Sequence, residues 1–127
     1  MTERPTMTVY GFVLSSPDPL ALAQFYHRLL GWPIGVDEPG WAKLTPPDGT
    51  GRGLSFHGEE KYVRPTWPTE TGEQLMMMHL DIGTEDMESA VAYAVEAGAT
   101  LADHQPQDDV RVLLDPDGHP FCLFPTG

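Results

Sequence analysis

The sequence has few basic side chains, a single cysteine and no long apolar stretch. Its 7 lysines and arginines stand against 19 aspartates and glutamates, which gives a formal net charge of -12. This balance argues against nucleic acid as a partner, because a phosphate backbone is bound through clustered lysine and arginine. The acidic surplus favours solubility, and it would also suit a ligand that carries positive charge.

The single cysteine, Cys122, rules out a disulfide within the chain and disfavours a cysteine-rich zinc site. It lies in an apolar stretch, where most cysteines act as small buried hydrophobic residues; a pocket wall or a reactive thiol is the alternative. No apolar stretch approaches the roughly 20 residues that span a bilayer. Residues 1–5 lack the apolar core of a signal peptide. We therefore expect a cytoplasmic protein without a membrane partner.

The first half of the chain predicts one helix among four strands. A strand is predicted over 7–14, where β-forming residues are concentrated. A helix follows, with Asp18 as its N-cap, Pro19 at its first position and Gly31 as its C-cap. Apolar residues within it recur at the i, i+3 and i+4 spacing of one buried face. The remaining predicted strands cover 32–36, 41–45 and 51–57.

The second half predicts the same order of elements. A strand over 75–82 leads into a helix that begins near Asp86, where acidic side chains favour the positive end of the helix. Gly98 ends this helix. The closing strands are predicted over 100–102, 110–114 and 119–124.

Two landmarks indicate that the halves are copies of one design. The helix-ending glycines, Gly31 and Gly98, lie 67 positions apart, and the Pro-Asp-Gly turns that end at Gly49 and Gly118 lie 69 apart. Near-equal offsets in the same order are typical of a duplication. We expect a single α+β domain over 1–127, with one βαβββ module over about 7–58 and another over 75–125. The modules would form a curled eight-stranded mixed sheet with helices outside and a ligand-binding hollow inside.

The segment between the modules, residues 59–74, differs in composition from both. It contains two prolines, several charges and the aromatic residues Tyr62 and Trp67. A plain linker is one interpretation. Aromatic loops of this length inside a small domain are often functional, so a packed loop that covers a site is the other.

Three motifs carry a resemblance to a known family. Residues 25–31, Phe-Tyr-His-Arg-Leu-Leu-Gly, resemble the first-helix signature of the vicinal oxygen chelate superfamily, the glyoxalase/bleomycin resistance/dioxygenase fold. Residues 78–82, Met-His-Leu-Asp-Ile, resemble its central strand, and residues 114–123 resemble its closing turn and strand. The resemblance extends over about residues 7–125, and the glyoxalase-like subgroup is the nearest match. It implies homodimers.

Enzymes of this superfamily usually hold a divalent metal with His, Gln or Glu from the inner strands. Of the positions implied here, only His79 carries a standard ligand, and Cys122 stands where a glutamate is usual. The first-strand and middle-strand positions fall at residues that are poor ligands: Gly11 or Phe12, and Gly53 or Ser55. A set of His57, His79 and Cys122 would favour zinc or a similar ion. Asp81 shares the strand face of His79.

Two hypotheses of function follow from the resemblance. The first is a metal-free protein that binds a small planar or aromatic molecule, including a cationic one. The second is a metal-dependent lyase, isomerase or dioxygenase that acts on neighbouring oxygens; whether the protein is an enzyme stays open. A scaffold with an empty hollow is a third alternative, and His79 can also be read as a core histidine. The residues expected to line the hollow are Trp41, Phe56, His57, Tyr62, Trp67, His79 and Cys122.

Overall fold

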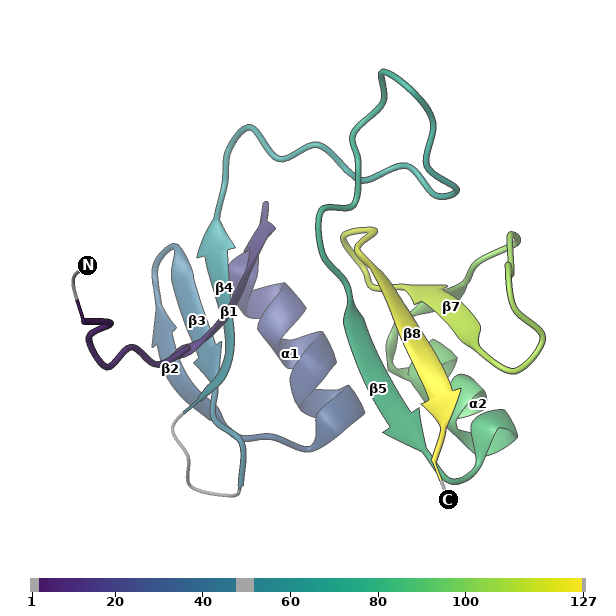
Figure 1. The fold of residues 1–127 in the computed structure, drawn as a ribbon, viewed down its shortest axis with the longest axis horizontal. Coiled ribbons are helices and arrows are strands. Elements are labelled where there is room, and N and C mark those ends of the chain that lie inside the picture. The colour runs from purple at the N-terminus through teal and green to yellow at the C-terminus, as the bar shows by residue number, and fades with distance from the viewer. Residues whose placement is uncertain (1–2, 48–51, 127) are drawn as a thin grey trace.

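The computed structural model describes residues 3–47 and 52–126, and it confirms an α+β fold of two βαβββ modules (Figure 1). The predicted Pro-Asp-Gly turn at 47–49 falls mostly outside the described residues. Module one consists of β1 (Gly11–Ser16), α1 (Pro19–Leu30), β2 (Ile34–Glu38), β3 (Trp41–Leu44) and β4 (Gly53–Gly58). Module two consists of β5 (Leu80–Thr84), α2 (Met87–Ala97), β6 (Thr100–Leu101), β7 (Arg111–Leu114) and β8 (Pro120–Pro125).

The eight strands are divided between two four-stranded sheets, one in each module. The strand orders are β1-β4-β3-β2 and β5-β8-β7-β6, so the two sheets have the same topology. In each sheet the first strand is parallel to its neighbour, β1 to β4 and β5 to β8, and the other pairs are antiparallel. β1 and β5 are therefore both edge strands, and the sheets are not joined into one closed surface.

Both helices begin and end at the predicted signals. The Asp18 side chain accepts a hydrogen bond from the Ala21 N–H at 3.2 Å, and Asp86 accepts one from the Ser89 N–H at 3.1 Å. Such caps satisfy N–H groups that a helix start leaves without partners. Gly31 ends α1 with a φ of +75°, a left-handed conformation that favours glycine.

The hydrophobic core is shared by the two modules. Phe25 and Tyr26 of α1 are fully buried, and their rings lie 6.1 and 6.2 Å from the ring of Phe121 on β8. Figure 1 shows α1 between the two sheets, with α2 behind β8. One helix of module one therefore packs against the sheet of module two, and burial of these rings stabilises both modules together.

Two predicted strands begin later than expected. β1 begins at Gly11, which pairs with Gly53, the first residue of β4. β5 begins at Leu80, which pairs with Phe121, and the preceding residue of β8 is Pro120, which has no N–H to offer. A strand needs a hydrogen-bonding neighbour as well as β-forming residues, so each strand begins where its neighbour in the sheet begins.

The segment between the modules is packed against module two. The Tyr62 hydroxyl donates to the Asp117 carbonyl oxygen at 2.8 Å, and the Trp67 indole N–H donates to the His104 carbonyl oxygen at 3.1 Å. The Arg64 guanidinium donates to the Pro116 carbonyl oxygen at 3.0 Å. These bonds favour the packed-loop interpretation over a plain linker. None of the helices in the described ranges has the length and apolar character needed to cross a membrane.

Candidate functional site

A cleft lies between β1 and β5, above α1. Its volume is about 430 Å³. Apolar side chains form its walls, Phe12 and Leu14 from β1 and Leu80 from β5, and Tyr26 of α1 lies beneath them. His79 and Asp81 also line it. The cleft exists because β1 and β5 are edge strands whose sheets are not joined.

Two smaller cavities extend this cleft in opposite directions. One, of about 310 Å³, shares Phe12, Leu80 and Asp81 with the cleft and continues to Trp32, beyond the end of α1. The other, of about 330 Å³, shares Met78 and His119 and continues beneath the connecting loop to Tyr62. Because neighbouring cavities share lining residues, they form one groove along the seam between the modules.

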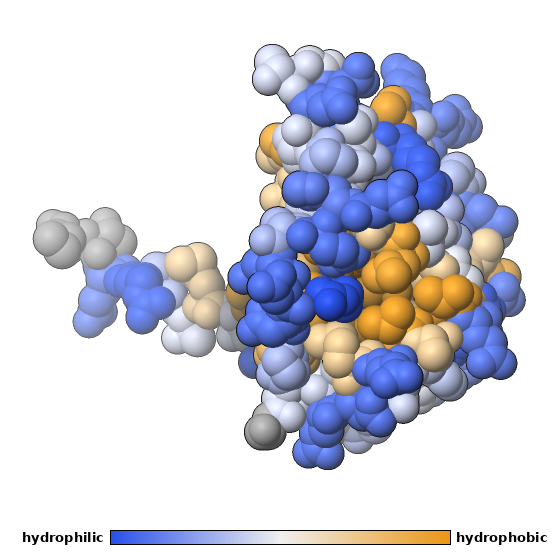
Figure 2. Space-filling view, turned by 90° about the vertical axis from the view of Figure 1, so that its right-hand side faces the viewer, coloured by the Kyte–Doolittle hydropathy of each residue, from blue (hydrophilic) through white to orange (hydrophobic). Residues whose placement is uncertain are grey.

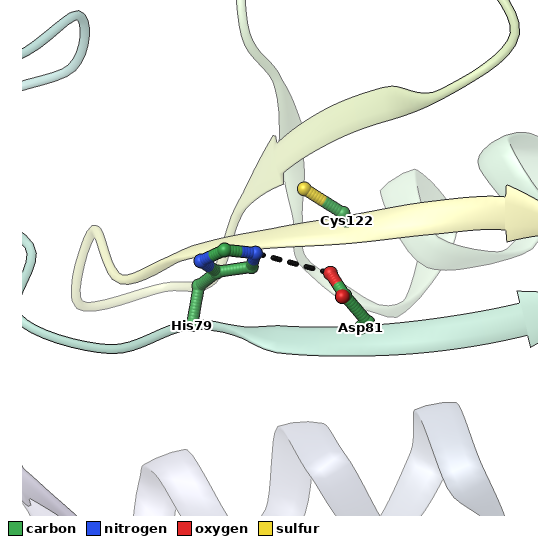
Figure 3. Close-up of side chains that lie close together, drawn as sticks. All are labelled: His79, Asp81 and Cys122. Carbon is green, nitrogen blue, oxygen red and sulfur yellow. Dashed lines mark ion pairs between the residues drawn. The ribbon is translucent and has the colours of Figure 1, made fainter.

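Three metal-ligating side chains converge on one face of the second sheet (Figure 3). Asp81 of β5 and Cys122 of β8 are directly paired in the parallel ladder, and His79 lies two residues before Asp81 on the same strand face. The His79 Nε2 atom lies 3.0 Å from the Asp81 Oδ1 atom. One ligand atom from each residue lies within 4.8 Å of the others.

This set of three fits a metal ion in chemistry and spacing. Imidazole nitrogen, carboxylate oxygen and thiolate sulfur are all zinc ligands, and ligand atoms around a tetrahedral ion lie about 3.3–3.8 Å apart. Small side-chain rotations would therefore close the three atoms around an ion. Without an ion, burial and the nearby Asp81 carboxylate raise the pKa of the Cys122 thiol, which favours the neutral form.

Of the metal set expected from the sequence, the structure brings together only His79 and Cys122. His57 lies on β4 in the other sheet, directly opposite Trp41 of β3, and does not join the cluster. Asp81 takes the third place. The period-two spacing of His79 and Asp81 in the sequence predicts that these two side chains share a strand face. Which histidine can reach Cys122 depends on the sheet in which it lies, and the sequence does not show that.

The other residues expected to line a hollow are dispersed. Phe56 is fully buried in the core, where its ring stacks on Tyr26 at 5.7 Å between centroids, so its assignment to the hollow is corrected. Its side chain points to the helix side because side chains alternate along β4. Trp41, Trp67 and Cys122 line none of the three cavities, and Tyr62 lines only the one beneath the loop.

The sequence did not predict a buried network of hydrogen bonds around Asp115. The Asp115 carboxylate, 1% exposed, accepts hydrogen bonds from the Tyr26 hydroxyl at 2.7 Å and from the backbone N–H groups of Asp117 and His119 at 3.0 Å. The His119 Nδ1 atom lies 2.8 Å from the same carboxylate. The turn at 115–119 was visible in the sequence, but Tyr26 is 89 positions away, and no local pattern reports such a pairing.

This network holds His119 at the rim of the groove. His119 lines both the main cleft and the cavity beneath the loop, and its Nε2 atom lies 3.2 Å from the Tyr62 hydroxyl. Burial is the main cause that raises the pKa values of the Tyr26 and Tyr62 hydroxyls well above their usual range. Both hydroxyls therefore stay protonated and act as hydrogen-bond donors.

Known structures share this fold over nearly the whole chain. A glyoxalase/bleomycin resistance protein/dioxygenase family enzyme from Burkholderia phytofirmans PsJN is 16% identical, with a TM-score of 0.69, covering 94% of this chain and 98% of that chain. A glyoxalase-related enzyme from Fulvimarina pelagi is 20% identical, with a TM-score of 0.65 and coverage of 95% and 89%. An antibiotic binding protein from Streptomyces sp. CB03234 is 20% identical, with a TM-score of 0.59 and coverage of 98% and 100%.

These identities are too low to transfer a reaction or a ligand, and they establish the fold alone. No protein of curated function matches the sequence significantly. The sequence pattern of the glyoxalase-like domain matches residues 11–124, which is most of the chain. The protein therefore belongs to the glyoxalase-like domain family, within the vicinal oxygen chelate superfamily that the three motifs predicted.

Proposed function

We propose that the protein binds a small planar or aromatic molecule with a cationic group in the cleft between β1 and β5. The observation that carries this proposal is the chemistry of the cleft lining. Its walls are apolar, and within the described residues Asp81 is the one carboxylate in a lining without lysine or arginine. Such a site favours an apolar body with one positively charged group near Asp81.

The size and charge of the protein support this ligand class. A cleft of about 430 Å³ lies at the lower end of the range in which small-molecule sites fall. Phe12, which is exposed, offers an aromatic surface for a planar ring. The net charge of -12 attracts cations at long range. The antibiotic binding protein from Streptomyces provides a precedent for a binding role on this fold.

Ligand pairs that differ only in charge test the proposal. Benzamidine and benzamide share shape and size, and only the first is a cation. We expect benzamidine to bind more tightly by calorimetry, and Asp81→Asn to remove that preference while leaving the weak binding of benzamide unchanged. Asp109→Asn, which neutralises an exposed carboxylate outside the cleft, is the matched control. Equal binding of both compounds, or a preference that survives Asp81→Asn, would contradict the proposal.

The cluster of His79, Asp81 and Cys122 favours a second candidate, a metal-dependent lyase, isomerase or dioxygenase acting on neighbouring oxygens. A bound divalent ion would supply a Lewis acid that polarises a substrate oxygen. The chain would hold it through the His79 imidazole nitrogen, the Asp81 carboxylate and the Cys122 sulfur. Because the pKa of the Cys122 thiol is raised, the thiol must lose its proton when the ion binds.

Metal content separates the two candidates. Untagged protein purified without chelator would carry about one ion per chain if the cluster is a metal site, and Co²⁺ substitution would give a thiolate charge-transfer band that Cys122→Ser removes. Thermal unfolding that does not change after chelation, in protein without metal, would favour the metal-free binding protein. Glu96→Gln, on an exposed helix face, controls for nonspecific cation binding.

A further inference from the structure

We propose that Tyr62 and His119 form a pH-sensitive latch, which holds the connecting loop (residues 59–74) over the groove when His119 is protonated and releases it when His119 is neutral. The latch would regulate access to the cleft between β1 and β5. The latch itself is independent of the proposed function, whereas its effect on a ligand rests on that function.

The latch is the contact between one tyrosine of the loop and the turn before β8. The Tyr62 hydroxyl donates to the Asp117 carbonyl oxygen at 2.8 Å, and its oxygen lies 3.2 Å from the His119 Nε2 atom. Burial raises the pKa of this hydroxyl, so it keeps its single proton. A carbonyl oxygen can only accept, so that proton belongs to the bond with Asp117. His119 must therefore donate the second bond from Nε2.

The other ring nitrogen of His119 is also a donor. Its Nδ1 atom lies 2.8 Å from one oxygen of the Asp115 carboxylate and 3.0 Å from the other. The Tyr26 hydroxyl and two backbone N–H groups donate to the same carboxylate, and a donor at Nδ1 fills its remaining acceptor site. A carboxyl group is a stronger acid than an imidazolium, so the proton between them lies on the ring. A histidine that donates from both nitrogens is a cation, and the observed bonds are complete only in that form.

Loss of this proton leaves the latch one donor short. Neutral His119 keeps its Nδ1 proton on Asp115, and its Nε2 atom becomes an acceptor. Tyr62 then has one proton for two acceptors, Nε2 and the Asp117 carbonyl oxygen. Closing the latch therefore takes up a proton, so closure is favoured at low pH and loses support as the pH rises. Histidine side chains change charge between about pH 5 and 8, so the change falls near physiological pH.

The charged groups nearest the ring favour its protonated form. The Asp115 carboxylate balances the charge of the ring directly, and the Asp117 carboxyl group attracts it as well. The Tyr26 hydroxyl approaches Asp115 from α1 and adds no charge. Other titratable or charged groups line the same cavities or lie beside the turn: Glu59, Lys61, Arg64, His79 and Asp81.

The loop is held by a small number of polar contacts. Arg64 and Trp67 bond to backbone carbonyl oxygens, which do not titrate, whereas Tyr62 has His119 as a second partner. The upper part of the molecule in Figure 2, where Figure 1 places the loop, is largely hydrophilic. Such a segment can move into water without exposing a large apolar surface, so loss of one anchor is enough to raise the population of the open loop.

The latch lies where the loop covers the groove. Tyr62 and His119 both line the cavity beneath the loop, and His119 also lines the main cleft. Movement of Tyr62 away from His119 would therefore open this cavity to water and widen the entrance to the cleft.

Limited proteolysis with trypsin tests the latch. The bond after Lys61 is a trypsin site directly beside Tyr62, whereas Arg64 precedes a proline and is protected. At each pH the cleavage rate is divided by that of a synthetic peptide of residues 57–66, which removes the pH dependence of trypsin itself. We expect this relative rate to rise about tenfold between pH 6 and pH 8.5, because one hydrogen bond to a charged group is lost. Circular dichroism checks that the protein stays folded at both pH values.

Four variants separate the latch from neighbouring groups. Tyr62→Phe, measured against its own peptide, should show the high relative rate at both pH values, and His119→Gln should show no change with pH. Asp117→Asn keeps the carbonyl oxygen but loses the adjacent carboxyl group, so the pH dependence should persist. Tyr93→Phe is the matched control, because that hydroxyl also donates to a carbonyl oxygen, and it should behave as the wild type.

Nitrogen NMR of the isotope-labelled His119 ring, assigned with His119→Gln, gives a measurement on the wild type itself. We expect both ring nitrogens to carry protons at pH 6 and Nε2 to lose its proton over the range in which the loop opens. A relative cleavage rate that is constant with pH, a pH dependence that persists in Tyr62→Phe, or a ring with one proton throughout would overturn the proposal.

Benzamidine association, measured by stopped flow, tests the effect on the cleft. The association rate of Tyr62→Phe divided by that of the wild type should be about ten at pH 6 and near one at pH 8.5. This ratio cancels the titration of groups that both proteins share, such as His79. A ratio near one at both pH values would overturn the regulation of the cleft and leave the latch intact. Absence of benzamidine binding in both proteins would overturn the cleft proposal and leave the latch, which the proteolysis tests, intact.

Discussion

At the scale of single residues, the buried Asp115 carboxylate is the clearest case of a polar group that the fold requires. A carboxylate with 1% exposure is costly unless donors surround it, and here the Tyr26 hydroxyl and two backbone N–H groups donate to it, with the His119 ring alongside. Because Tyr26 belongs to α1 and Asp115 to the turn before β8, these bonds join the two modules.

Removal of the Tyr26 hydroxyl should therefore destabilise the whole fold. Tyr26→Phe leaves Asp115 short of one donor without changing the volume of the ring, and we expect a loss of about 1–3 kcal/mol in the free energy of unfolding, measured by urea denaturation. Tyr93→Phe is the control, because the Tyr93 hydroxyl makes a similar 2.9 Å bond to the Arg28 carbonyl oxygen in an exposed place. Equal losses in the two variants would contradict a special role for burial.

Asp117 predicts a pH dependence of stability. Burial raises the pKa of its carboxyl above the ordinary value of 3.8, although the hydrogen bond from Ser16, 2.6 Å long, partly opposes this shift. A raised pKa in the folded state means that Asp117 contributes stability below the unfolded pKa and that this contribution is lost as the pH rises through the folded pKa.

Asp117→Asn should therefore remove one pH-dependent contribution. The stability of the wild type relative to this variant is expected to fall as the pH rises from below 3.8 toward neutrality. Urea denaturation across that pH range measures the difference. A constant difference across the range, or one that grows with pH, would show that the carboxyl titrates normally or with a lowered pKa in the folded protein.

At the scale of elements, sequence signals located the helices better than the strands. The helix ends depend on neighbours in sequence, such as the Asp18 side chain that caps α1 and Gly31 that ends it. The beginnings of β1 and β5 depend on where β4 and β8 begin, and the sequence of an isolated strand does not contain that information. The spacing within one strand was enough to place His79 and Asp81 on one face. Which histidine meets Cys122 depends on how the strands pair, so it could not be predicted.

The turn at 115–119 gives a test of how the connecting loop is held. Gly118 has a φ of +90°, and a Cβ atom there would collide with the Arg64 side chain of the loop. Gly118→Ala should therefore cost about 1–3 kcal/mol of stability, from strain in the left-handed region together with the displaced Arg64. Denaturation measures this loss, and limited proteolysis should show faster cleavage within the loop.

Gly72 supplies a matched control for that substitution. Its φ of +87° is nearly the same, and a Cβ atom there would meet nothing within 4 Å. Gly72→Ala therefore has the backbone strain without the collision, and the difference between the two variants isolates the packing of Arg64 on the turn. If both variants lose the same stability and show the same cleavage rate, the contact between the loop and the turn has no energetic role.

At the scale of the whole molecule, the repeated sequence and the shared core lead to different expectations. Two copies of one βαβββ unit could fold as two independent units, and the duplicated landmarks cannot exclude this. The structure favours one cooperative unit, because Phe25 and Tyr26 of module one pack against Phe121 of module two and Tyr26 also bonds to Asp115. Contacts between the repeats form only in the folded protein, and each repeat supplies one of the two surfaces that meet. The sequence of either repeat therefore does not predict them.

Phe121→Ala tests this cooperativity directly. Loss of a fully buried ring should destabilise the protein by about 3–5 kcal/mol, and hydrogen exchange should accelerate in α1 as much as in β8. Leu101→Ala, at a 42% exposed position of β6, should have a small effect that is confined to module two. If exchange in α1 stayed slow while β8 opened, the modules would be separate folding units. The cleft between them would then be a movable interface, and a ligand bound there would stabilise the contact between the modules rather than fill a preformed site.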